Sequence, residues 1–167
     1  MPIDVLRLLL LVGLAGFGGA LARAQDQVEK DIILYSRHLL TNDNELFRYE
    51  AAVELSKRGP RAKSAVPALA GALVDPSARG REAARKAIVS IGAVSVGGLV
   101  ESMRSPDPAV RRQVAEMVDH FGEHCGAHMR TLISMLGDGE PAVRDLLADA
   151  LGKLGEPALL PLLEALD

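Results

Sequence analysis

Four residues whose side chains can ligate a metal ion lie within the nine-residue stretch 120–128. They are His120, His124, Cys125 and His128. Imidazole nitrogens and a thiolate sulfur are good ligands for zinc or copper, and a loop made flexible by Gly122 and Gly126 could bring them around one ion. Their spacing matches no established zinc motif, and the two glycines break any helix that would align the histidines. Two interpretations stay open: a metal site, or a polar hairpin loop in which Cys125 packs as a small hydrophobe.

Other constellations that carry chemistry are missing from the sequence. It has no glycine-rich phosphate loop, no Gly-x-Ser-x-Gly elbow and no paired carboxylates in a recognisable frame. The formal net charge is −3, with no Trp and only five Tyr and Phe residues. A nucleic-acid-binding protein needs a basic surface and aromatic side chains for base stacking. We therefore expect a protein that is not an enzyme, holds no cofactor and binds no nucleic acid.

The N-terminus has the composition of a secretory signal peptide. Arg7 precedes an apolar run at residues 8–17, small residues follow, and Ala22-Arg23-Ala24 fits the small-x-small cleavage pattern. We expect residues 1–24 to be removed, leaving no stable membrane span and placing the protein in the periplasm or outside the cell. The alternative is an uncleaved anchor in the inner membrane, although the charge-free run is short for a span.

The rest of the chain contains a block that repeats four times without gaps. The copies occupy residues 48–59, 81–92, 111–122 and 144–155. Each begins with an arginine (Arg48, Arg81, Arg111, Arg144) and ends eleven residues later with a glycine (Gly59, Gly92, Gly122, Gly155). Apolar residues recur at the third, seventh and tenth positions after the arginine, which is the spacing of one helix face. We expect each glycine to adopt the left-handed conformation just past a helix end.

A turn signal rich in Asn, Asp, Ser, Gly and Pro precedes each block, and a second apolar segment follows it. These second segments cover residues 65–73, 96–103, 129–136 and 158–166. This pattern predicts that each unit consists of a helix, a tight turn and another helix. Leu and Ala predominate, as expected for close-packed helices. The units span about 42–74, 75–104, 105–136 and 137–167, and residues 25–41 form an N-terminal cap helix that covers the open end of the stack.

The repeat resembles a known family, the short HEAT-like repeats also called phycobilisome-lyase-type repeats. The closest matches are Asp107-Pro108-Ala109-Val110-Arg111 and Glu140-Pro141-Ala142-Val143-Arg144, with Leu-Gly ending the helix. The second unit departs from the pattern, with Ser77-Ala78-Arg79-Gly80 before its arginine. The resemblance covers residues 42–167 and implies an all-α fold: a right-handed α-solenoid of about four HEAT-like helical hairpins behind the cap helix.

The four arginines are expected to stack at successive units, about 10 Å apart at ordinary helix-packing distances. One interpretation is a ladder that binds anions. The other is structural: each arginine bonds an aspartate or the helix-end carbonyls of an adjacent turn, with Asp75, Asp107 and Asp138 as the carboxylates. The family pattern includes this arginine and so favours the structural role.

The second helices line the inner face of such a stack, which is the usual binding surface of a solenoid. We expect them to present Ala68, Ala72, Glu101, Ser102, Arg104, Arg130, Thr131, Ser134 and Glu164. The expected function is an exported, non-catalytic protein-interaction or scaffold module whose partner is another protein. A metal-binding protein centred on residues 120–128 is the alternative. A lyase-like activity on a tetrapyrrole, implied only by the family resemblance, is a fainter one.

Overall fold

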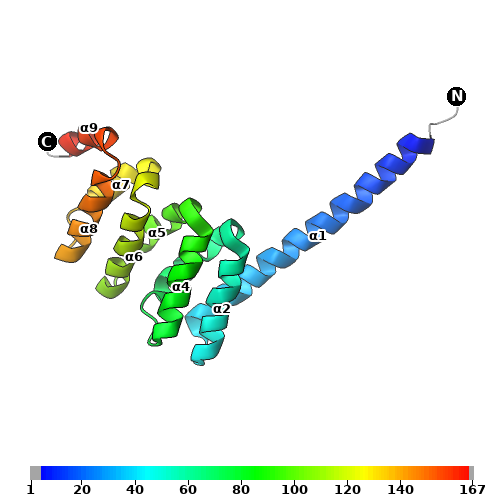
Figure 1. Ribbon diagram of the computed structural model, residues 1–167, viewed down its shortest axis with the longest axis horizontal. Coiled ribbons are helices and arrows are strands. Elements are labelled where there is room, and N and C mark those ends of the chain that lie inside the picture. The colour runs from blue at the N-terminus through cyan, green and yellow to red at the C-terminus, as the bar shows by residue number, and fades with distance from the viewer. Residues whose placement is uncertain (1–4, 166–167) are drawn as a thin grey trace.

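The computed structural model describes the backbone of residues 5–165 and the side chains of residues 19–165. In this part of the chain all regular elements are helices (Figure 1). A long first helix is followed by four helical hairpins stacked side by side, so the predicted all-α solenoid is confirmed. The first four residues of the predicted signal peptide, and Leu166 in the last predicted helix, lie outside the described residues.

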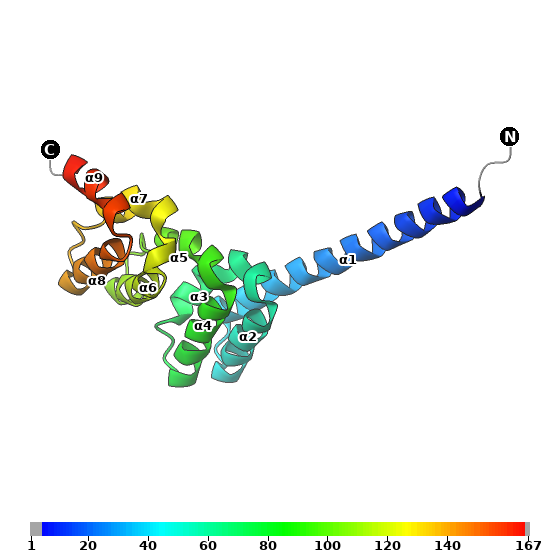
Figure 2. The ribbon, with the colours of Figure 1, turned by 45° about the horizontal axis from the view of Figure 1, so that its top comes forward.

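The elements follow one another in a simple order. After α1 (Val5–Thr41), the hairpins pair α2 (Glu45–Arg58) with α3 (Val66–Ala72), α4 (Ala78–Ile91) with α5 (Val96–Ser102), α6 (Pro108–His120) with α7 (Met129–Ser134), and α8 (Pro141–Gly152) with α9 (Glu156–Glu164). Short 3-10 helices at Gly59–Ala65, Gly92–Ser95, Gly122–His124 and Gly126–His128 connect the first three pairs. The first helices of the hairpins form an outer layer and the second helices an inner layer (Figures 1 and 2).

Helix α1 continues without a break through the predicted cleavage point between Ala24 and Gln25. Only its C-terminal part packs on the first hairpin, while its N-terminal part extends away from the solenoid (Figure 1). Ile32 and Leu39 are buried there. Arg58 of α2 bonds Asp31 at 2.9 Å and lies over the ring of Tyr35, which fixes α1 against α2.

The outer helices begin at side chains suited to that position. The Oδ1 atom of Asn44 accepts a hydrogen bond from the amide of Leu46 at 2.9 Å, and Asp107 caps the amide of Ala109 at 2.8 Å. These bonds satisfy amides that have no partner within the helix. Pro108 and Pro141 occupy the first helical position of α6 and α8, where a missing amide costs nothing.

Three of the four repeat glycines turn the chain with a positive φ. Gly59, Gly92 and Gly155 have φ of 53°, 79° and 67°, combined with an extended ψ that glycine alone adopts readily. The same prediction for Gly122 is wrong, because α6 already ends at His120 and Gly122 has no positive φ. A Cβ atom at Gly122 would lie 2.6 Å from Cδ of Lys153, so this glycine allows α8 to pack closely.

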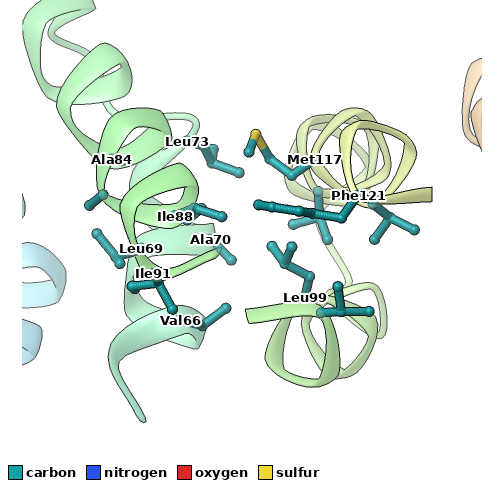
Figure 3. Packing of buried hydrophobic residues seen from close by; sticks show 14 of the residues in the cluster. Val66, Leu69, Ala70, Leu73, Ala84, Ile88, Ile91, Leu99, Met117 and Phe121 are labelled. Atoms are coloured by element: carbon teal, nitrogen blue, oxygen red, sulfur yellow. The ribbon is translucent and has the colours of Figure 1, made fainter. Parts of the chain in front are cut away.

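A single apolar core runs between the two layers from α1 to α8. Figure 3 shows its middle part, where Ile88 and Leu73 face Met117 and Phe121. The segment Ala78–Ser102 is apolar and long enough in composition to cross a membrane, but half of it is buried in this core. The chain also reverses within it at Gly92, between α4 and α5, so the segment is part of the solenoid rather than one straight span.

The outer helices are not evenly spaced. Helix α2 packs directly along α4, and α6 along α8, whereas α4 and α6 have almost no backbone contact (Figures 1 and 2). Small buried residues such as Ala52 and Ala87 suit the close approach of α2 and α4, while Met117 and Phe121 stand between α4 and α6 (Figure 3). We call α1–α5 the N-terminal half, α6–α9 the C-terminal half, and the boundary between them the middle junction.

Candidate interaction surface

The turns that join successive hairpins are built on one repeated contact. The residue six positions before each repeat arginine accepts a hydrogen bond from the amide two residues further along. These pairs are Asn42 with Asn44 (3.0 Å), Asp75 with Ser77 (2.7 Å), Ser105 with Asp107 (3.3 Å), and Asp138 with Glu140 (2.9 Å). Such local side-chain bonds hold the chain in a turn and lead it into the next helix.

The four repeat arginines fasten these turns from within. In each unit an Nη1 atom donates to the carbonyl of the residue six positions earlier: Arg48 to Asn42 (2.9 Å), Arg81 to Asp75 (2.7 Å), Arg111 to Ser105 (3.1 Å) and Arg144 to Asp138 (2.7 Å). The guanidinium groups are thus engaged in holding backbone. This arrangement supports the structural role of the arginines over the anion-binding ladder.

Two of the arginines also reach the turn of the next unit. Arg48 donates through Nε and Nη2 to both carboxylate oxygens of Asp75 at 2.6 and 3.0 Å, and Arg111 does the same to Asp138 at 2.8 and 3.2 Å. The Arg48 guanidinium holds the pKa of Asp75 below its ordinary value of 3.8, and Arg111 lowers the pKa of Asp138 in the same way. Both are paired, charge-assisted contacts that fix one unit to the next.

The ion pair at Asp75 is the more enclosed of the two, because a glycine makes room for it. The Asp75 side chain is 4% exposed and that of Asp138 is 13% exposed. A Cβ atom at Gly80 would lie 2.8 Å from Cγ of Asp75, which explains the departure of the second unit from the repeat pattern at this position. The equivalent position in the fourth unit is Val143.

The expected contact through Asp107 is wrong. Its side chain caps the amide of Ala109 at the start of α6 and is hydrogen-bonded to no arginine among the residues the structure describes. The residue at the position of Asp75 and Asp138 in this turn is Ser105, whose hydroxyl cannot form an ion pair. Arg81 accordingly bonds only the carbonyls of Asp75 and Pro76 among the described residues.

The four predicted metal ligands are not brought together. Cys125 is fully buried, and its Sγ donates to the carbonyls of Phe121 and Val118 at 3.5 and 3.6 Å. Burial, and then the nearby Asp119 carboxylate, raise the pKa of this thiol to about 11, which disfavours the thiolate that binds metals.

The three histidines of this loop point to different surroundings. His120 lies edge-on to the Phe121 ring at 4.9 Å, His124 is exposed, and His128 packs beside Gly97 of α5. No group of three His, Cys, Asp or Glu side chains able to hold a metal ion occurs among the residues the structure describes. Metal binding at residues 120–128 stays a prediction that this geometry does not favour.

The inner layer carries a shallow groove of about 470 Å³, which we call the inner groove. Its lining residues come from α3 (Pro67, Ala70, Gly71), from α5 and the turn after it (Glu101, Ser102, Arg104, Ser105) and from α6 (Val110). Apolar and small side chains form one side, and one acidic and one basic residue stand on the other. The groove therefore combines apolar surface with one acidic and one basic side chain.

Apolar surface continues from the inner groove onto α1. A Cβ atom at Gly71 would lie 3.7 Å from Cδ2 of Leu40, so the two residues are neighbours. Leu40 is 65% exposed, and Ile33, two helical turns earlier on α1, is 64% exposed. The exposed leucine therefore extends the apolar side of the groove, and this part of the surface was not predicted from the sequence.

Eight of the nine predicted inner-face residues divide into three groups, and the ninth, Thr131, is half-buried in α7. Glu101, Ser102 and Arg104 line the inner groove. Arg130, Ser134 and Glu164 line a second hollow between α7 and α9, in which Arg130 lies 3.8 Å from Glu164. Ala68 and Ala72 were expected on this face and are instead buried between the layers, 6% and 5% exposed. Their neighbours Pro67 and Gly71 take the surface positions, because α3 is rotated by one residue relative to the expected orientation.

Comparison with protein families agrees with the repeat. Residues 96–167, from α5 to the end of the chain, match a family model of HEAT repeats. The units in this range are similar to HEAT repeats. The HEAT-like units and the two hairpins before them share the arginine contact in each turn, and together they form one solenoid. No significant match is found among curated proteins.

Two solved structures are among those that align with this chain. A chain from a study of TOG–tubulin binding specificity, microtubule dynamics and mitotic spindle formation superimposes with a TM-score of 0.61 at 14% sequence identity. The alignment covers 81% of this chain and 64% of that chain. An engineered protein aligns with a TM-score of 0.44 at 19% identity, over 83% of this chain and 68% of the other. At such low identity the first likeness is evidence for the α-solenoid fold alone.

Proposed function

We propose that this protein is an exported, non-catalytic interaction module whose inner groove binds a segment of another protein. The observation that carries the proposal is the inner groove itself, which lies on the inner face of a HEAT-like solenoid and continues over Leu40. Exposed apolar surface beside polar rim residues is typical of protein interaction sites. From the resemblance to phycobilisome-lyase-type repeats we take the repeat motif alone and infer no lyase activity.

The chemistry of the groove favours binding over catalysis. Its titratable residues are Glu101 and Arg104, and no histidine, cysteine or second carboxylate lines it. General acid–base or nucleophilic catalysis needs a titratable group held close to a second functional group. Glu101 and Arg104 instead offer one acceptor and one donor group at the rim, which can orient a bound peptide through hydrogen bonds.

Position 71 allows a direct test of the groove. Gly71→Arg places a long charged side chain in the groove, and the Cβ contact with Leu40 is an ordinary 3.7 Å, so the fold should be retained. Gly152→Arg is the matched control, because a Cβ atom at Gly152 meets nothing within 4 Å. Each full-length protein is immobilised and exposed to an extract of periplasmic and secreted proteins, and the retained proteins are quantified by mass spectrometry.

We expect a partner that is retained by the unmodified chain and by Gly152→Arg and is lost with Gly71→Arg. A partner retained equally by all three proteins contradicts the groove as the binding site. Retention of no protein, with circular dichroism showing all three folded, contradicts the interaction function. Export is tested separately: cell fractionation should place the chain outside the cytoplasm, and mass spectrometry should find an N-terminus at Gln25.

A further inference from the structure

We call the junction between the first and second units and the junction between the third and fourth units the outer junctions. Each outer junction is fastened near both ends of its helices. Between the first and second units, Arg48 bonds Asp75 at the turn end, and the hydroxyls of Ser56 and Ser90 meet at 2.9 Å near the other end. Between the third and fourth units, Arg111 bonds Asp138 at the turn end. Lys153 bonds the Asp119 carboxylate at 2.6 Å near the other end. A junction held at two separated points resists bending about either point.

The middle junction lacks both of these fastenings among the described residues. At the turn end, Ser105 replaces the aspartate, so Arg81 has no carboxylate partner. Among the described residues the polar contacts between α4 and α6 all come from Arg85, near the middle of the helices. Arg85 bonds Gln113 at 2.9 Å, Glu116 at 3.3 Å and the sulfur of Met117 at 3.7 Å. Arg85 is 39% exposed, and an ion pair this open to solvent contributes about 0–1 kcal/mol.

The apolar contacts at this junction can also adapt when the two halves move relative to each other. Met117 and Phe121 of α6 fill the space toward Ile88 of α4 and Leu73 after α3 (Figure 3). Methionine is unbranched and adapts to changes in its surroundings at little cost. In a solenoid each interface contributes its own term to stability, so the interface with the fewest fastenings is the one that opens first.

The geometry points to a hinge: we propose that the solenoid bends at the middle junction and that this bend sets the width of the inner groove. Pro67, Gly71 and Glu101 belong to the N-terminal half, whereas Val110 belongs to α6 in the C-terminal half. A rotation of one half relative to the other therefore carries Val110 toward or away from α3. The role of the groove as a binding site rests on the proposed function, but the hinge is measured without any partner.

The hinge is tested by distance measurements between spin labels in the full chain. Cysteines at Lys86 and Arg112, both exposed, report across the middle junction alone, and cysteines at Lys57 and Lys86 report within the N-terminal half. Cys125 stays in place because it is fully buried and reacts poorly with labels. We expect the distance distribution across the junction to be about twofold broader, since only that pair spans the weak interface. Equal widths would overturn the proposal.

A substitution then restores the missing fastening. Ser105→Asp keeps an acceptor for the amide of Asp107 and adds the carboxylate that Asp75 and Asp138 provide elsewhere. We expect the distribution across the middle junction to narrow toward the width within the N-terminal half, while Ser105→Ala leaves it broad. A folded Ser105→Asp protein with an unchanged distribution would overturn the role of the missing ion pair.

A converse variant tests the same proposal even if Ser105→Asp does not fold. Asp138→Ser introduces a serine turn between the third and fourth units, so labels at Arg112 and Ala148, which lie on α6 and α8, should show a broader distribution than in the unmodified chain. An unchanged width in that pair would contradict the proposal. Because these readouts need no ligand, a rigid junction together with a functional groove would disprove the hinge alone.

Discussion

The first and middle junctions join equivalent pairs of outer helices, and yet they differ in how those helices pack and in which side chains bond across them. At the first junction, α2 and α4 pack along their length, and Arg48 forms a bidentate ion pair with the enclosed Asp75. At the middle junction, α4 and α6 stand apart, and Ser105 replaces the aspartate. The repeat therefore sets the shape of each hairpin, whereas a few residues in the turns decide how firmly neighbouring hairpins are joined.

The largest effect should come from removing the carboxylate of the first junction. Asp75→Ala leaves the Arg48 guanidinium, 14% exposed, without its partner and also removes the bond to the Ser77 amide. Breaking such a buried pair should lower the free energy of unfolding by about 2–3 kcal/mol. Urea denaturation followed by circular dichroism measures the change. Ser105→Ala at the middle junction, which loses only a turn bond, should cost less than half as much; equal losses would refute the contrast.

A second test uses two neighbouring glycines of α5 that face different junctions. A Cβ atom at Gly98 would lie 2.9 Å from Cβ of Val66, while one at Gly97 would make an ordinary 3.4 Å contact with Nε2 of His128 across the middle junction. Gly98→Ala should destabilise by about 1–3 kcal/mol through overpacking, and Gly97→Ala should be neutral or stabilise by up to about 1 kcal/mol through helix propensity. Thermal unfolding of both variants measures this difference. A larger loss of stability for Gly97→Ala would mean that the middle junction is the more tightly packed of the two.

Acid should weaken the outer junctions selectively. The pKa values of Asp75 and Asp138 are lowered in the folded chain, so their contribution to stability is fully present above the ordinary pKa of 3.8 and is lost as pH falls through the lower folded values. Stability of the unmodified chain should therefore drop as the pH falls below about 4. The double variant Asp75→Asn, Asp138→Asn should show a flatter profile, and identical profiles would argue against the ion pairs.

The smallest effect concerns the reactivity of Cys125 and leaves overall stability unchanged. Burial raises the pKa of this thiol to about 11, so a thiol reagent at pH 8 should label it only after the C-terminal half opens locally. Asp138→Ala loosens that half and should speed labelling, while Asp75→Ala should speed it less. Fast labelling of the unmodified chain would show that the loop at residues 120–128 is open in the native state.

The sequence predicted the hairpins well because their signals are local. The spacing of apolar residues after Arg48 and Arg111 marks helix faces, and Asp107 and Pro108 mark a helix start. These features depend on residues within one or two helical turns of one another. The turning role of Gly59, Gly92 and Gly155 follows from the same local signals. Gly122 has no such role, and the reason for a glycine there, the close approach of Lys153 from another unit, leaves no local signal.

The surface was harder to predict because it depends on contacts between units. The inner groove includes Val110 and Gly71, which are nearly forty residues apart and carry no sign of a shared role. The rotation of α3 by one residue decides whether Ala68 or Pro67 faces outward, and periodicity in a seven-residue helix is too short to fix it. The replacement of aspartate by Ser105 is visible in an alignment of the four turns, and could have been found by comparing the position six residues before each arginine.

The distribution of contacts along the chain also bears on how the protein is made. Every fastening of the first junction lies between Arg48 and Ser90, so the N-terminal half can close as soon as α4 has left the ribosome. In the C-terminal half, Arg111 must await Asp138, and Asp119 must await Lys153 at the end of α8. Folding should therefore proceed in two stages from the N-terminus. A chain that is exported unfolded, as proposed, would have to be held open during synthesis until α1 has been engaged by the export machinery.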